Sequence, residues 1–162
     1  ILGFGAIQLD HAAVPGEIAI ADLSTMHWVV PELSGSAPHY PLPGTGSAKD
    51  AIGYLHANCG HCHNPDSKVY TDQGVNMELR LTVGTLGALS TTPVYQTAVD
   101  HDAMTPVNGH TKRIVAGDPQ ASILIDRFEA DPMGSLHMPL LGSEVMDPAA
   151  DTTLRDWITN IQ

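Results

Sequence analysis

Two cysteines and a histidine stand close together near the middle of the chain, in the order Cys59, Gly60, His61, Cys62, His63. These are the only two cysteines in the sequence, and their C-x-x-C-H spacing is the signature of covalent c-type haem attachment. Each thiol can add to one haem vinyl group, and the two intervening residues bring both sulfur atoms to the same face of the porphyrin. His63 is then carried under the ring, where its imidazole can bind the iron. The motif therefore predicts one covalent haem with His63 as an axial ligand.

Other chemistry is open to the same cysteine pair. Cys59 and Cys62 can hold a zinc ion with two distant histidines, although the chain has no second C-x-x-C to complete such a site. A thioredoxin-like redox pair needs an alternating strand–helix pattern around it, which is absent. A disulfide across only two residues would be strained. Haem is the leading prediction, and zinc is the main alternative.

Composition excludes several classes of function. The net charge is −11 with only seven Lys and Arg residues. Nucleic-acid binding is therefore not expected, because phosphate contacts need clustered basic side chains, and an anionic lipid surface is disfavoured for the same reason. No apolar run approaches the roughly 18 residues of a membrane-spanning helix. The acidic surface favours a basic or neutral partner, or it serves solubility alone.

Turn-forming residues indicate how the chain is divided. With 15 glycines, 12 prolines and only 5% aromatic residues, a compact fold with much loop and few strands is expected. Residues 1–46 read as an irregular N-terminal arm or connecting segment, and residues 47–162 as one helical domain. Residues 66–113 predict a long loop excursion, which the edge of the haem would order.

Three helices are expected in the second part. The first is capped by Ser47, with Asp50 at the third position of a capping box, and it runs into Cys59. The second covers residues 119–129. The third begins near residues 147–148 and carries apolar residues at helical spacing.

The second axial ligand decides what a haem does. Methionine gives an electron carrier of raised potential, histidine gives a lower potential, and an open face allows ligand chemistry. Met138 is the best-placed methionine, because it lies directly before Pro139 in a loop between two expected helices. Met133 is the second choice, and His137 is the ligand of a bis-histidine variant.

Haem propionates need hydrogen-bond donors where they are partly buried. We expect Arg127 on the second helix and Arg80 in the excursion to donate hydrogen bonds to the propionates. The planar guanidinium matches a carboxylate in two-point contact.

Four stretches of the sequence together resemble class I c-type cytochromes. Residues 54–65 resemble the haem-binding helix end of that family, and residues 117–124 with Arg127 resemble its middle helix. Residues 137–142 are similar to its methionine-ligand loop, and residues 154–158 to its closing helix. The resemblance covers about residues 47–162 and implies a mainly α, cytochrome c-like small helical bundle around one covalent haem. It places Ala51, Leu55 and Trp157 where the first and last helices cross.

The resemblance implies electron transfer by a haem iron cycling between Fe(II) and Fe(III), bound by His63 and Met138, and no enzymatic activity. Haem attachment at this motif implies export to the periplasm or the cell exterior. The arm resembles a segment that precedes such domains in larger secreted bacterial proteins. We therefore expect a module or subunit of a larger redox assembly, with a dehydrogenase or another cytochrome as partner. The alternative is a haem enzyme or gas sensor with a labile distal ligand, such as a peroxidase.

Overall fold

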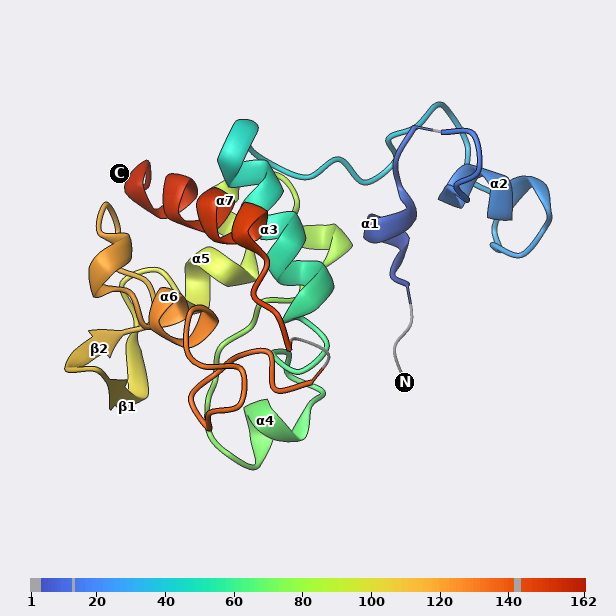
Figure 1. Cartoon of the computed structure of the whole chain (residues 1–162). Helices are drawn as coiled ribbons and strands as arrows, with labels where there is room; N and C mark the ends of the chain where they lie inside the picture. Colours follow the sequence, from blue (N-terminus) through green and yellow to red (C-terminus); the bar gives the residue numbers. More distant parts are fainter. Residues whose placement is uncertain (1–3, 13, 142–143) are drawn as a thin grey trace.

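The computed structural model describes residues 4–12, 14–141 and 144–162. The N-terminal arm contains two short helices, α1 (Ala6–Leu9) and α2 (Ile20–Thr25), and extends away from the body of the molecule (Figure 1). The buried carboxylate of Asp10 holds the arm together. It accepts the backbone N–H groups of His39, at 2.9 Å, and of Tyr40.

Two long helices form the centre of the body and pack against each other: α3 (Gly46–Asn58) and α7 (Pro148–Thr159). The start of α7 agrees with the sequence prediction, because the Asp147 carboxylate accepts the first free N–H groups and Pro148 occupies the first turn. The start of α3 differs. Thr45 is its N-cap residue and makes no side-chain cap hydrogen bond, so the predicted Ser47 cap is wrong.

The hydrophobic core is built around these two helices and also takes in buried residues of the loops and short helices. Ala51, Leu55 and Trp157, expected from the sequence at a helix crossing, all belong to it and are each at most 1% exposed. The indole N–H of Trp157 donates to the hydroxyl of Tyr95 at 3.4 Å, which gives the buried ring a polar partner.

The other elements are short. Three further α-helices have four to six residues each: α4 (Lys68–Thr71), α5 (Pro93–Thr97) and α6 (Ile123–Phe128). Three 3-10 turns complete the helical elements in the described part of the body: η1 (Val83–Thr85), η2 (Leu89–Thr91) and η3 (Pro119–Ala121). Strands β1 (Asp102–Val107) and β2 (His110–Lys112) form an antiparallel hairpin. None of the helices in the described residues is long and apolar enough to cross a membrane.

The expected mainly α, cytochrome c-like helical bundle is therefore wrong. Helix makes up 38% of the structure, and among the described residues only α3 and α7 reach seven residues. Helices of a single turn are too short to pack side by side as a bundle does, and their backbone groups need loop partners instead. The fold is better described as one helix pair with long, hydrogen-bonded loops and a small hairpin.

Two local features explain much of this departure. Asn108 and Gly109 both have positive φ, 51° and 87°, and so form the kind of two-residue turn that closes a β-hairpin. The helix predicted over residues 119–129 is divided at Ser122. The buried Ser122 hydroxyl donates to the Asp118 carbonyl at 2.8 Å and accepts the Val115 N–H at 2.9 Å, and these bonds hold its backbone in an extended conformation.

Candidate haem-attachment site

The cysteine motif forms a tight turn at the C-terminal end of α3. Cys59 is the C-cap residue, and its carbonyl accepts the N–H of Cys62 at 3.1 Å and of His63 at 2.9 Å. Both thiols are free, with Cys59 half-buried and Cys62 exposed. The backbone turn therefore places Cys59, Cys62 and His63 together at the C-terminal end of α3.

A buried asparagine braces this turn. The side-chain amide of Asn64 donates to the carbonyls of Gly60 at 2.7 Å and His61 at 2.9 Å, while its oxygen accepts the Asp66 N–H at 3.0 Å. The sequence analysis did not identify this role. Asn is known to hydrogen-bond to nearby backbone, and its position directly after the motif was the available signal.

Gly60 lies where another part of the backbone comes very close. A Cβ atom there would be 2.6 Å from the His56 carbonyl oxygen and 2.9 Å from the Arg80 Cα. Both neighbours are main-chain atoms, which cannot move away as the end of a side chain can. Glycine is therefore required for the turn to reach its observed position.

Part of the excursion passes directly beside the motif. We call residues 75–81 the strap. Its Leu79 N–H donates to the His63 carbonyl at 2.8 Å, and its Leu81 N–H donates to Nδ1 of His56 at 3.0 Å. Leu79 and Leu81 are buried, so the strap is anchored by apolar packing as well as by these bonds. A segment left unassigned by the sequence thus fixes the backbone of the candidate ligand.

The electrostatic surroundings favour a neutral His63. Burial lowers the pKa of His63, and the positive charges of Arg113 and Arg127 lower it further. Its Nδ1 atom is buried, and among the described residues it has no hydrogen-bond partner. A neutral imidazole has a nitrogen lone pair that can bind a metal.

The thiol of Cys59 is held in its protonated form. Burial raises the pKa of this thiol to about 12, with a further contribution from Cys62. Within the described residues, no group of three or more His, Cys, Asp or Glu side chains is arranged to hold a metal ion. The zinc site considered from the sequence is therefore not assembled here. A haem brings four nitrogen ligands of its own and needs only axial ligands from the protein.

The loop that carries Met138 is held near the motif at both ends. At one end, Phe128 makes an edge-on contact with Tyr54 of α3, with ring centroids 6.1 Å apart. Asp147, at the other end of the loop, acts electrostatically on the same tyrosine. Burial raises the pKa of the Tyr54 phenol, and the charges of Asp147 and Cys59 raise it further. Figure 1 shows the loop below the C-terminal end of α3.

Met138 is half-buried, and its backbone is hydrogen-bonded to that of Arg127. Its N–H donates to the Arg127 carbonyl at 3.0 Å, and Arg127 is one of the two charges that act on His63. The other proposed ligands are placed differently. Met133 is 91% exposed, and His137 is buried with Nδ1 3.0 Å from the Ala130 carbonyl oxygen of its own loop.

The two arginines expected to bind propionates also lie around the motif. The guanidinium of Arg80 pairs with Asp66 at 2.6 Å, and both side chains are largely exposed. The guanidinium of Arg127 lies 3.4 Å from the Leu136 carbonyl oxygen in the Met138 loop. Arg113, which the sequence analysis did not single out, is the other charge acting on His63.

The residues present fit a covalent haem. The turn supplies two free thiols and a neutral imidazole, which are the donors that covalent haem needs from the protein, and the neighbouring loop carries exposed apolar side chains. These are Met133, Leu136, Leu140, Leu141 and Val145, between 42% and 91% exposed.

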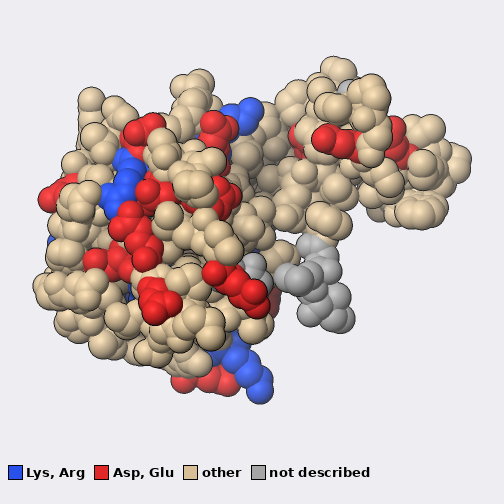
Figure 2. Space-filling model, in the orientation of Figure 1, with Lys and Arg blue, Asp and Glu red and all other residues tan. Residues whose placement is uncertain are grey.

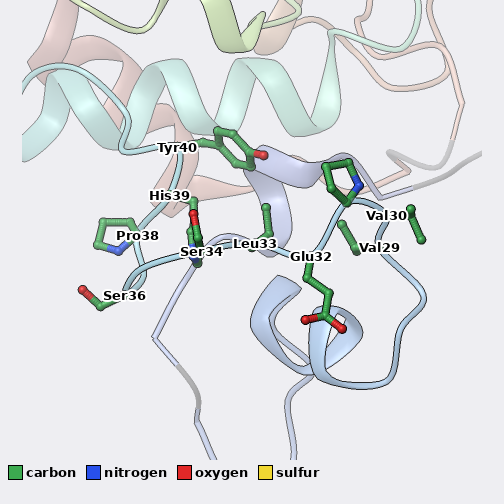
Figure 3. Close-up of a pocket in the computed structure, with 10 residues that line it drawn as sticks. Val29, Val30, Glu32, Leu33, Ser34, Ser36, Pro38, His39 and Tyr40 are labelled. Atoms are coloured by element: carbon green, nitrogen blue, oxygen red, sulfur yellow. The ribbon is translucent and has the colours of Figure 1, made fainter.

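A hollow of about 530 Å³ in the arm, shown in Figure 3, is a weaker candidate site. Glu32, His39 and Tyr40 are the ionisable residues that line it. Nδ1 of His27 is 2.6 Å from the Glu32 carboxylate, and the ring of His39 lies 3.2 Å from the carboxylate of Asp10. The carboxylate of Glu32 and the ring of His39 are therefore engaged within the arm.

No protein-family model, no curated protein and no solved structure matches this chain. The assignment of the site therefore depends on its own residues and geometry.

Proposed function

We propose that the chain is an electron-transfer protein that carries one covalent haem c at Cys59 and Cys62. The observation that carries the proposal is the turn at the end of α3, which holds both free thiols beside a neutral, half-buried His63. When bound, the haem supplies an iron that gains and loses one electron.

The chain's own residues have defined tasks in this proposal. Each thiol adds across one vinyl group, so that a C–S bond forms and the thiol hydrogen passes to the other vinyl carbon. His63 donates a nitrogen lone pair, and its backbone position is held by the strap. The Met138 thioether would be the other protein ligand of the iron, and a thioether favours the reduced state.

The proposal extends to the partner and the location. Figure 2 shows acidic side chains spread over the visible face of the body and few Lys and Arg side chains, in line with the net charge of −11. A redox partner with a basic or neutral docking face, such as a dehydrogenase or another cytochrome, suits this surface. The chain then works outside the cytoplasm, as a module or subunit of a larger redox assembly.

The test is expression of the full chain in the periplasm of a bacterium with haem-attachment machinery. The unmutated chain should keep its haem after denaturing electrophoresis, and the double variant Cys59→Ser, Cys62→Ser should lose it. Absence of haem from the unmutated chain, together with bound zinc, would refute the proposal. Ready binding of carbon monoxide by the reduced protein would instead favour the haem enzyme or gas sensor with a labile distal ligand.

A further inference from the structure

Arg113 ties together segments that are far apart in the sequence. Its half-buried guanidinium donates to three main-chain carbonyls: Val75 at 2.5 Å, Asn76 at 3.0 Å and Thr97 at 2.5 Å. Two of these carbonyls open the strap, and the third ends α5. A planar, five-donor guanidinium can hold three carbonyls in this way, whereas a lysine amine cannot hold the same geometry.

The same clamp reaches the candidate ligand through the strap. The Thr97 hydroxyl lies 2.8 Å from the Glu78 backbone nitrogen, whose N–H it accepts, and one residue later Leu79 donates to the His63 carbonyl at 2.8 Å. The strap is therefore held by Arg113 and Thr97 on one side and by the haem motif on the other.

The charge of Arg113 is not neutralised by a contacting carboxylate among the described residues. Asp102, whose charge acts on Arg113 from a distance, is itself 3.5 Å from the amine of Lys112. Burial lowers the pKa of Arg113, but a guanidinium stays protonated in proteins. Its hydrogen bonds to the strap, which is itself bonded to the His63 carbonyl, hold this fixed positive charge on the strap that borders the motif.

We infer that Arg113 is a positioning residue of the proposed haem site, which clamps the strap against His63 and places one fixed positive charge near the iron. The inference depends on the proposed function. Ferric haem carries one more positive charge than ferrous haem, so a nearby guanidinium favours the ferrous state and raises the reduction potential. A clamp that only stabilises the fold would leave the potential unchanged.

The experiment compares Arg113→Gln and Arg113→Lys in the full, haem-loaded chain. Lys112→Gln is the matched control, because it removes the neighbouring positive charge from a residue that bonds to the Asp100 carbonyl and not to the strap. The midpoint potential is measured by spectroelectrochemical titration. Hydrogen exchange of the Leu79 and Leu81 amides reports on the strap.

Arg113→Gln should lower the potential and speed exchange at both amides. Arg113→Lys should leave the midpoint potential close to that of the unmutated chain, because it keeps the positive charge. It should still speed amide exchange, because lysine cannot make the guanidinium's hydrogen bonds to the strap carbonyls. Lys112→Gln should change neither the potential nor the exchange rates. An unchanged potential in Arg113→Gln would overturn this inference while leaving the proposed function intact. If Arg113→Gln does not fold, Arg113→Lys decides the matter: unchanged hydrogen exchange at the Leu79 and Leu81 amides would also overturn the inference. Absence of covalent haem from the unmutated chain would refute the proposed function, and this inference with it.

Discussion

Replacing Gly60 with alanine adds one methyl group at the closest approach of two backbone segments in the candidate site. The new carbon would meet the His56 carbonyl oxygen at 2.6 Å and the Arg80 Cα at 2.9 Å. The turn and the strap must therefore move apart, which weakens the bonds from Asn64 and Leu79 that hold the motif.

The size of the effect follows from the nature of these contacts. Inserting a methylene into a well-packed region costs about 1–3 kcal/mol, and we expect the upper part of this range because both neighbours are backbone. For a chain of this size each kcal/mol lowers Tm by about 2–4 °C. A loss of about 2–3 kcal/mol therefore corresponds to a fall in Tm of about 4–12 °C.

Gly84→Ala is the matched control. Gly84 has no heavy atom within 4 Å of its added Cβ and no positive φ. We expect its stability to change by less than about 0.5 kcal/mol, or to rise slightly because alanine restricts the unfolded chain. Thermal and denaturant unfolding of the two variants measures the difference, and the yield of covalent haem measures the effect on the motif. Equal Tm values for the two variants would show that the backbone approach at Gly60 is not as close as described.

Two further predictions concern a buried histidine and the second axial ligand. Burial lowers the pKa of His56, and the charges of His61 and Arg80 lower it further, so the unfolded chain binds a proton that the folded chain does not. The free energy of unfolding should therefore fall as the pH drops from about 7 to about 5. In denaturant titrations at each pH, His56→Gln should make the free energy of unfolding depend less on pH. If the variant keeps the full pH dependence, other groups cause it. Met138→Ala should lower the reduction potential and remove the near-infrared charge-transfer band of ferric haem, whereas the exposed Met133→Ala should change neither; an unaltered band in Met138→Ala would move the ligand assignment to another residue.

Local signals in the sequence predicted the proposed chemistry and the start of α7. The spacing of Cys59, Cys62 and His63 depends only on neighbouring residues, and the structure places them in one turn. The α7 start at Asp147 and Pro148 was also predictable, since a capping carboxylate and an N-terminal proline act within one helical turn.

The hairpin was missed, although its signal was present. Asn108-Gly109 is a strong marker for a two-residue turn, and the expectation of a long loop led the flanking residues to be read as irregular. The predicted helix over residues 119–129 failed for a different reason. The buried Ser122 hydroxyl bonds to the Asp118 carbonyl and the Val115 N–H, and neither bond follows from helical periodicity.

The sequence by itself predicted which residues would attach the proposed haem, because covalent attachment requires particular side chains at fixed spacing along one stretch of chain. It also determined the buried faces of α3 and α7, since apolar periodicity directly reflects which side of a helix avoids water. Only the tertiary structure decided what surrounds His63. The strap, the Arg113 clamp and the close approach of Arg80 to Gly60 join residues separated by 16 or more positions, and their partners are mostly main-chain groups that every residue possesses. Such contacts leave no mark in residue types, so folding alone places them.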